Sequence, residues 1–427
     1  MTRAPRRRST RRQFLRHAAF AAGGAAAAPY VLTSAALGAA GRPAASERIV
    51  MGAIGIGGRG RYVMGAHMNN EDVQMVAVCD VQGPRRDAAK QAVDRKYGHA
   101  DCKTYIDLRE LLARADIDAV VSATGDNWHS TAAILAIRAG KDVYSEKPCS
   151  VTIGESRALV ETVRRHAAVY QCGTQRRSVG HFQFAKDLVA SGRLGELKAL
   201  HAEKSPKWGE VYQDSLPPMP APPREVIDWD LWLGPAPWRP YNAQYHARSY
   251  WGGHLDFAGG SITEWGSHTA DLCQWAAGYD ETSPVEYEPR PGRDVHARYA
   301  DGVELIFRAP IGRGSCGVRF EGTEGWVEVD DSGTIATHPA SLRGLHKFGR
   351  GYPADDHVRN FLDCVKSRRQ PRAHAAAAHR SITACHCANI ALRLGRKVTW
   401  DPAREEFPGD RDANGLGCRT IREPWRL

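Results

Sequence analysis

The sequence lacks a C-x-x-C pair, although it contains ten cysteines. The commonest spacing of structural zinc sites and of thioredoxin-like redox sites is therefore missing. The closest two cysteines are Cys385 and Cys387, and others, such as Cys79, lie in hydrophobic runs. We therefore expect most cysteines to be free thiols with a structural role.

The sequence also has no internal repeat, no low-complexity tract beyond its N-terminus and no basic stripe. The net charge is +10, but seven arginines lie in the first sixteen residues with no acid among them. Elsewhere charges of both signs are interspersed, which argues against a surface that binds nucleic acid. With 427 residues, 42% hydrophobic and 25% charged, the chain has ordinary globular composition and room for two or three domains.

No long uninterrupted hydrophobic run is present either. The Ala/Gly-rich stretch after Arg16 is broken by two glycines and by Pro29, which makes it too weak for a membrane span. Residues 9–16 read STRRQFLR, and small residues follow at 38–40, a pattern that resembles a twin-arginine export signal. Residues 1–46 are therefore expected to be signal and linker, either cleaved near Ala40 or kept as an anchor. The alternative is an arginine-rich tail without a targeting role.

If the signal functions, the twin-arginine export machinery is a partner of the chain. The protein is then periplasmic or secreted, exported already folded, and has no integral membrane span beyond the signal.

Residues 47–172 alternate strand-like and helix-like patterns. Hydrophobic runs predict buried strands, and amphipathic segments lie between them. This order predicts a doubly wound parallel α/β sheet. The expected strands are 49–54, 73–79, 119–123 and 142–144, and the expected helical segments include 107–112 and 130–139.

The pattern changes in residues 173–427, which we expect to form a second α/β domain with an open, mainly antiparallel sheet. Residues 205–251 are rich in proline and contain five of the eleven tryptophans, which indicates a long loop region with aromatic anchors. Short strands separated by glycine turns then predict an antiparallel meander. The expected elements are a helix near 263–277, strands at 295–299, 303–307, 316–320 and 326–329, and closing helices at 356–366 and 377–395.

A glycine fingerprint follows the first expected strand. Gly55-Ile56-Gly57-Gly58-Arg59-Gly60 is a G-x-G-x-x-G that opens a helical pattern, and the next strand ends in Asp80. Such glycines allow a tight turn and a close approach of a pyrophosphate to a helix N-terminus. Asp80 would accept hydrogen bonds from the adenosine ribose and repel a 2′-phosphate, which favours NAD over NADP. Arg85 and Arg86 weaken that preference. The competing interpretation is a glycine turn without nucleotide.

Two further loops fall at the carboxyl ends of expected strands. One comprises Thr124-Gly125-Asp126-Asn127-Trp128-His129, and the other is Glu146-Lys147-Pro148. In doubly wound sheets this edge binds the ligand. A packing or capping role for His129 and a surface turn for Lys147 are the simpler alternatives.

A second constellation lies in the expected helix near 263–277. Glu264 and His268 are four residues apart, and His268 and Asp271 are three apart, so they share a helix face. A carboxylate beside an imidazole can orient its tautomer and raise its basicity, which suits proton transfer. Two alternatives remain open: a metal site formed with His254 or Asp256, and a histidine satisfied by packing.

These motifs together resemble the Gfo/Idh/MocA oxidoreductase family. The resemblance rests on the glycine loop, Asp80, the 124–129 loop, Glu146-Lys147-Pro148 and the Gly-Gly-x₃-acid-x₃-His pattern ending at His268. Residues 320–326 (FEGTEGW) and 357–361 (HVRNF) look like the family's exported branch. The resemblance implies a Rossmann domain, a second α/β domain, and hydride transfer between a sugar carbon and nicotinamide.

The resemblance also implies residue roles, without a metal. Lys147 would hold the reacting hydroxyl, His268 would act as general base or acid, and Glu264, where the family more often has Asp, would be the catalytic carboxylate. Gly125 and Asn127 also depart from the residues common in the family. The residues implied in cofactor binding are Gly55, Gly57, Gly58, Arg59, Gly60, Asp80, Thr124, Asn127, Trp128, His129, Glu146 and Lys147.

The sequence therefore predicts an NAD-dependent oxidoreductase acting on a sugar or sugar-derivative hydroxyl. Export favours a tightly held, internally recycled cofactor. One alternative is an NAD-dependent glycosidase that works by transient C3 oxidation and elimination; glycosidases of this superfamily do not keep the lysine found at Lys147. A second is a non-catalytic sugar-binding protein. The loop 205–251 can wall a sugar site, although packing is the simpler role for most of its tryptophans, and an open sheet favours a homo-oligomer.

Overall fold

The computed structural model describes residues 43–204, 211–310, 314–345 and 354–427. The predicted twin-arginine motif and Trp208 lie outside these ranges. The chain divides into two units, and the first, which ends at Arg48, contains the short helix η1 (Ala45–Glu47). All further description concerns the second unit, Ile49–Leu427. Among the helices of the described ranges, none combines the length and the apolar character that crossing a bilayer requires.

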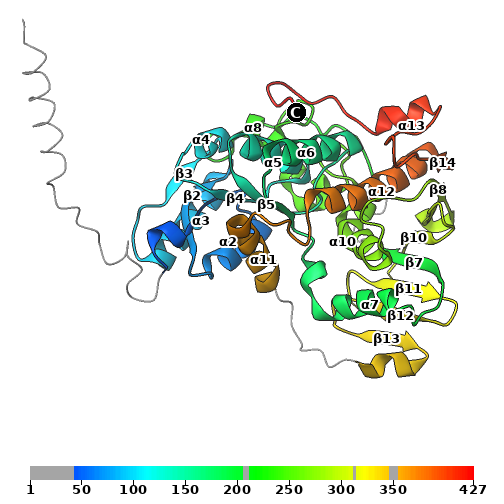
Figure 1. The fold of residues 1–427 in the computed structure, drawn as a ribbon. Coiled ribbons are helices and arrows are strands. Elements are labelled where there is room, and N and C mark those ends of the chain that lie inside the picture. The colour runs from blue at the N-terminus through cyan, green and yellow to red at the C-terminus, as the bar shows by residue number, and fades with distance from the viewer. Residues whose placement is uncertain (1–42, 205–210, 311–313, 346–353) are drawn as a thin grey trace, which may run out of the picture. The chain divides into compact units, whose positions relative to one another are not determined.

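A six-stranded parallel sheet forms the first half of this unit, as the sequence predicted (Figure 1). Its strand order is β3-β2-β1-β4-β5-β6, so the winding direction reverses between β1 and β4. In such sheets ligands bind at the carboxyl ends of the strands beside this reversal. The strands are β1 (Ile49–Ile54), β2 (Val73–Cys79), β3 (Lys103–Tyr105), β4 (Ala119–Ser122), β5 (Asp142–Ser145) and β6 (Tyr170–Cys172).

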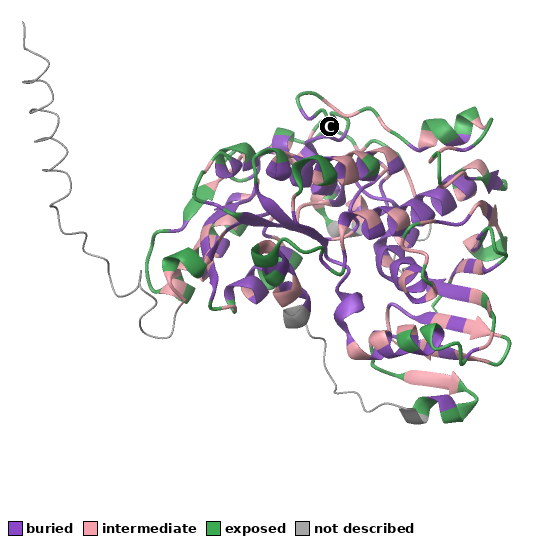
Figure 2. Cartoon of the chain, viewed as in Figure 1, coloured by how far each residue is buried: buried purple, intermediate pink, exposed green. Residues whose placement is uncertain are grey.

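Helices cover both faces of the parallel sheet. They are α2 (Gly58–Met68), α3 (Gly83–Tyr97), α4 (Leu108–Leu112), α5 (Asp126–Arg138) and α6 (Ile153–His166). Hydrophobic residues of α2 and α3 pack on one face, and those of α4, α5 and α6 belong to the core on the other. Figure 2 shows the central strands as buried, in keeping with β4 and β5, which are buried at every position.

A helix from the far end of the chain completes the first core. In Figure 1, α11 (Ala354–Ser367) lies beside α2, and Val358 and Phe361 join the cluster that contains Val63 of α2. Arg359 pairs with Asp72 at 2.8 Å, which ties the helix to the loop before β2. The nucleotide-type domain is therefore not continuous in sequence.

An eight-stranded mixed sheet forms the second half, in the order β13-β12-β11-β7-β10-β9-β8-β14. Only β7 and β10 pair in parallel, so the expected antiparallel meander is confirmed for most of the sheet. Inward side chains alternate with outward ones, as Leu305 and Phe307 of β10 show. The strands are β7 (Leu197–Glu203), β8 (Glu286–Pro289), β9 (Val295–Arg298), β10 (Glu304–Arg308), β11 (Val318–Gly322), β12 (Gly325–Val329), β13 (Ile335–His338) and β14 (Val398–Thr399).

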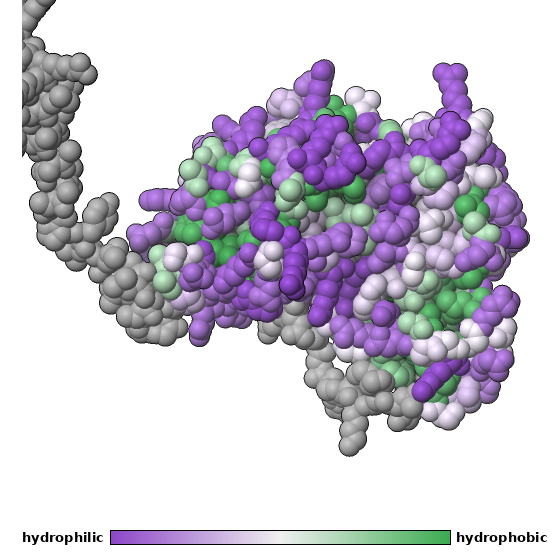
Figure 3. Space-filling view, in the orientation of Figure 1, coloured by the Kyte–Doolittle hydropathy of each residue, from purple (hydrophilic) through white to green (hydrophobic). Residues whose placement is uncertain are grey.

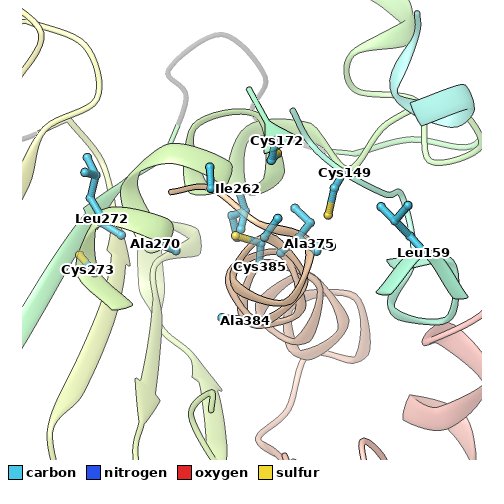
Figure 4. Close-up of a cluster of buried hydrophobic side chains, with 14 of the residues drawn as sticks. Cys149, Leu159, Cys172, Ile262, Ala270, Leu272, Cys273, Ala375, Ala384 and Cys385 are labelled. Carbon is cyan, nitrogen blue, oxygen red and sulfur yellow. The ribbon is translucent and has the colours of Figure 1, made fainter. Parts of the chain in front are cut away.

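Three helices pack on this sheet: α7 (Gly180–Ala190), α10 (Gly260–Ala277) and α12 (Ala375–Leu394). Figure 4 shows part of the core around α10 and α12, in which Cys385 of α12 lies among small and aliphatic side chains. All ten cysteines are free and nine are buried, Cys418 being exposed, which confirms the expectation of free thiols. Because α12 also packs against α6, one continuous core joins the two sheets.

The remaining short elements lie in loops. Tryptophan 229 stacks on Trp232 at 4.8 Å between ring centroids, whereas Trp238 is 64% exposed. Hydrophilic side chains predominate on the face drawn in Figure 3, with hydrophobic ones gathered in smaller patches. The short elements are η2 (Gln175–Ser178), α8 (Trp229–Leu233), η3 (Ala243–His246), α9 (Arg248–Trp251), η4 (Pro291–Arg293), η5 (Ala340–Leu345) and α13 (Arg411–Leu416).

Candidate active site

A cavity of about 790 Å³ lies at the carboxyl edge of the parallel sheet. Its wall combines the loops after β1, β2, β4 and β5 with residues of η2, α8 and α10. Clefts of this size, at this place in an open α/β sheet, are typical of cofactor and substrate sites.

The glycine loop forms one end of the cavity. Gly55 has φ +76°, and a Cβ at this position would lie 2.6 Å from the backbone nitrogen of Thr124. A Cβ on Gly60 would lie 2.1 Å from the carbonyl oxygen of Gly55, so both positions require glycine. Helix α2 begins at Gly58 without a side-chain cap, and nothing lies within 4 Å of a Cβ built there. This open helix N-terminus suits a pyrophosphate.

Asp80 stands at the end of β2 and lines the same cavity. Its carboxylate accepts hydrogen bonds from the backbone N–H of Ile56, at 2.6 Å, and of Gln82, at 2.8 Å. Burial raises the pKa of Asp80. Each carboxylate oxygen keeps a further lone pair, so the side chain holds the glycine loop and can still accept from a ribose hydroxyl.

The loop after β4 also lines the cavity, but its polar side chains bond within the protein. Asn127 donates to the carbonyl of Leu233 at 3.0 Å, and the indole of Trp128 donates to that of Leu231 at 2.9 Å. Nδ1 of His129 lies 2.6 Å from the carbonyl oxygen of Pro148. These contacts fasten the loop to α8 and to the turn after β5, and a role in cofactor binding stays a prediction for Thr124 and for all three residues.

Glu146 joins the glycine loop to the turn after β5. Its Oε1 accepts from Nε of Arg59 at 2.8 Å and from the Gln175 amide at 3.4 Å. Arg59 also lies 5.0 Å from the ring centroid of Tyr62 at the cavity wall. The ion pair therefore bridges the expected pyrophosphate end and the expected nicotinamide end of the cavity.

Lys147 and Glu264 meet across the cavity wall. Nζ of Lys147 lies 3.3 Å from Oε2 of Glu264 and donates to the backbone carbonyl of Glu264 at 3.1 Å. An ammonium has three N–H donors, so this pair leaves one for a ligand. Lys147 is thus a cavity residue and not a surface turn lysine, because its side chain is 12% exposed.

His268 lies in the same wall, but its neighbours differ from those that helix spacing suggested. Asp271 is bound by Arg177, at 2.7 and 2.8 Å, and by Ser381 at 3.0 Å, so the predicted Asp271–imidazole pair does not form. Nε2 of His268 contacts the guanidinium of Arg176 instead. Burial and the charges of Arg176, Lys147 and Arg59 hold the pKa of His268 well below its usual value. The imidazole is therefore held in its neutral form.

The alternative of a metal site finds no support. Asp256 pairs with Arg239, and His254 contacts the same arginine at 3.0 Å and the carbonyl of Asp214 at 2.9 Å. Across the described parts of the chain, no three His, Cys, Asp or Glu side chains gather closely enough to hold a metal ion.

Sequence reasoning missed the part of the wall that Gln175 and Arg176 form, whereas it expected tryptophans of 205–251 there. Gln175 and Arg176 follow β6, and the end of this sixth parallel strand falls at the ligand edge, a signal that could have identified them. The tryptophans of 205–251 have different roles. Trp232 and Trp251 line the cavity, whereas Trp229 stacks against Trp232.

The wall fits a dinucleotide at one end and a small polar ligand at the other. The glycine loop offers open space and a helix N-terminus without a side-chain cap, whereas Lys147, Glu264 and His268 gather on the opposite side. Trp265 faces both Lys147 and Arg176, each 5.8 Å from its ring centroid. Cationic and aromatic groups therefore surround the position of the second ligand.

Comparison with family models places both halves in one family. A model described as the NAD-binding Rossmann fold of an oxidoreductase family, Gfo/Idh/MocA, matches residues 49–174. A second, described as the C-terminal alpha/beta domain of the same oxidoreductase family, matches residues 182–427.

Individual proteins match this chain either over only part of its length or at low sequence identity. Inositol 2-dehydrogenase of Serratia proteamaculans is 33% identical over 169 residues, 39% of this chain and 49% of that protein, so the match spans about half of the relative. A glycosyl hydrolase family 109 protein of Saccharopolyspora erythraea is 36% identical over 129 residues. The match covers 29% of this chain and 28% of that protein. The crystal structure of the WlbA dehydrogenase of Bordetella pertussis, in complex with NADH and UDP-GlcNAcA, is similar in fold, with a TM-score of 0.61 and 19% sequence identity. The alignment covers 83% of this chain and 99% of the WlbA chain.

Proposed function

Since the chain belongs to the Gfo/Idh/MocA oxidoreductase family, we propose that it is an NAD-dependent oxidoreductase acting on a hydroxyl of a sugar or sugar derivative. The observation that carries the proposal is the placement of Lys147 and His268 in one cavity wall with the glycine loop. NAD is preferred to NADP because the carboxylate of Asp80, in the cavity wall, would accept from ribose hydroxyls and repel a 2′-phosphate.

The chain's own residues account for the proton chemistry. When NAD is bound, its nicotinamide accepts the hydride. The free N–H of Lys147 holds the substrate oxygen and stabilises the negative charge that grows on it. Glu264 keeps the ammonium in place, and the neutral His268 takes the hydroxyl proton. Trp232 and Trp251 give an apolar wall for the C–H face of a sugar.

The second candidate is a redox-assisted glycosidase, which the partial match to a glycosyl hydrolase family 109 protein favours. Such a reaction would use the same cofactor to oxidise C3 transiently and would end without net oxidation. Lys147 argues against it, because glycosidases of this superfamily do not keep a lysine at this position, whereas here the lysine is present and paired with Glu264. A non-catalytic sugar-binding protein would not require this corner.

One experiment separates these functions. The purified protein is denatured and the released nucleotide identified, and the native protein is then screened against polyols, free sugars and glycosides. Keto products are expected without glycoside cleavage. Cleavage of a glycoside without net NADH formation would support the glycosidase, and protein that neither carries nor takes up a nicotinamide nucleotide would overturn the proposal.

We also propose that the protein is exported by the twin-arginine machinery and keeps its cofactor bound. Residues 9–16 support the route, and a location without a free nicotinamide pool would demand a retained cofactor. The test is fractionation of cells expressing the full chain beside an Arg11→Lys, Arg12→Lys variant. Equal amounts outside the cytoplasm in both would contradict the route.

The outer face of the eight-stranded sheet supports a further proposal, a homo-oligomer. Its side chains are half-buried, and Arg319 lies over Trp326 at 4.1 Å from the ring centroid. Sedimentation should show a species larger than the 46.8 kDa chain, and Trp326→Glu should shift it toward the monomer. A wild-type monomer at micromolar concentration would contradict the proposal.

A further inference from the structure

Neither ring nitrogen of His268 is available to a ligand. Nε2 contacts Nη1 of Arg176, and Nδ1 is buried and has no hydrogen-bond partner in the described ranges. A guanidinium has only donors, so Nε2 accepts and the ring proton resides on Nδ1. The nitrogen with the lone pair, which a general base must use, is therefore already occupied.

Arg176 is firmly anchored in this position. Asp331 accepts from its Nε at 3.1 Å and from its Nη2 at 2.6 Å, a bidentate pair, and Ser315 donates to the same carboxylate at 2.8 Å. The side chain of Arg176 is 10% exposed and that of Asp331 16%. Bidentate pairing fixes the guanidinium plane. A carboxylate from the loop after β12 thus aims Nη1 at the imidazole.

We propose that Arg176, held by Asp331, is a positioning residue that caps the general base, and that a substrate hydroxyl must replace Arg176 at Nε2 of His268 before proton transfer. The inference rests on the proposed dehydrogenase function. It extends that function, because the base becomes usable only in the presence of a substrate. Proton transfer then moves the hydroxyl hydrogen to Nε2, and the imidazole becomes positively charged.

The surrounding charges explain why the release of Nε2 from Arg176 matters. Arg176, Lys147 and Arg59 all oppose a proton on His268, as does His357 to a smaller extent. On its own helix, Glu264 is paired with Lys147 and Asp271 with Arg177, so neither carboxylate offsets these charges fully. Withdrawal of the nearest cation would free the lone pair and also raise the basicity of the ring.

Histidine NMR tests the cap without any substrate. The signals of isotope-labelled histidine are titrated in wild type and in Arg176→Gln, Arg176→Lys and Asp331→Asn, with His268→Asn used for assignment. In Arg176→Gln the pKa of His268 should rise by about 1–3 units, the usual effect of removing one nearby charge. Arg176→Lys, which keeps the charge, should leave it low. Arg298→Gln, which removes an exposed charge, is the control.

The acylation rates of individual histidines provide a second test of the same proposal. Diethyl pyrocarbonate attacks unprotonated imidazole nitrogens, and peptide mass spectrometry reports each histidine separately. His268 should react at least about tenfold faster in Arg176→Gln and in Asp331→Asn than in wild type, where the exposed His99 is the internal reference. Equal rates and an unchanged titration in Arg176→Gln would overturn the cap.

A failure of the proposed dehydrogenase function can be distinguished from a failure of the proposed role of Arg176. NAD binding is measured in the same samples by quenching of tryptophan fluorescence. If wild type binds no nicotinamide nucleotide, the proposed function fails, whereas the titration and acylation results still decide the contact between Arg176 and His268. If NAD binds and His268 titrates identically in every variant, the cap alone is wrong.

Discussion

Nζ of Lys147 lies 3.3 Å from the carboxylate of Glu264, a residue 117 positions later in the sequence, and donates to its backbone carbonyl. The turn after β5 and the first turns of α10 are thereby joined at the cavity. Ammonium and carboxylate are both nearly buried, so their charges compensate each other where water is scarce.

Replacing Lys147 by alanine should lower kcat/KM by about 100- to 1,000-fold, the usual effect of removing one group that stabilises a developing oxyanion. The affinity for NAD should stay within about threefold, because the ammonium faces the substrate end. Steady-state kinetics and fluorescence titration measure both quantities. Lys198→Ala, at an exposed position of β7, is the control. Full turnover of Lys147→Ala would exclude the assigned role.

Gly55→Ala should abolish NAD binding, because the new Cβ would meet the backbone of Thr124 at 2.6 Å and the residue has a positive φ. Gly58→Ala is the matched comparison, since nothing lies within 4 Å of a Cβ there. Its thermal midpoint should equal that of wild type. Calorimetry and NAD titration of both variants check the pair, and wild-type affinity in Gly55→Ala would contradict the geometry.

Arg177→Met should destabilise the fold by about 3–5 kcal/mol, because Asp271 would be left as a buried charge without its partner. Urea unfolding measures the loss. The double variant Arg177→Met, Asp271→Leu should recover much of it, since it removes both charges. Arg404→Met, which breaks an exposed pair with Glu406, should change the free energy of unfolding by less than about 1 kcal/mol.

The free energy of unfolding should depend on pH in part through the titration of Asp72. Burial alone would raise the pKa of this carboxyl, but Arg359 and Lys366 outweigh it and hold the pKa at about 2. A carboxyl whose folded pKa lies below the unfolded one stabilises the fold above about pH 4, and this contribution is lost as the pH falls toward about 2.

Asp72→Asn should therefore cost about 1 kcal/mol at pH 6, a figure reduced because water reaches part of the cluster, and almost nothing at pH 2. Denaturant unfolding across this range checks it. Asp363→Asn, which removes the more exposed partner of Arg359, should show little change with pH. A constant difference between wild type and Asp72→Asn at every pH would contradict the assignment.

Much of the fold could be predicted from local pattern. The runs at 49–54 and 73–79 are buried strands because parallel strands are covered on both faces. The three-residue strands Lys103–Tyr105 and Tyr170–Cys172 escaped prediction, since so short a segment shows no periodicity. The start of α5 was placed four residues late, because Asp126 and Asn127 resemble loop residues and not a first helical turn.

The partners of His268 could not be predicted in the same way. Helix spacing brought Glu264 and Asp271 near the imidazole, and both do lie on α10. The deciding contacts come from Arg176 and Arg177, which lie 92 and 94 positions earlier than their partners His268 and Asp271. The sequence analysis did not identify the strand that precedes these two adjacent arginines. It therefore did not expect them as the partners of His268 and Asp271.

The return of α11 to the first domain has a consequence for biosynthesis. The core on one face of the parallel sheet is closed by Phe361 and its neighbours, and Arg368 binds Asp142 at the start of β5. A ribosome that has made only the first 174 residues has not yet delivered these side chains. The dinucleotide half therefore cannot reach its final packing during its own synthesis, and this core closes only after α11 has been made.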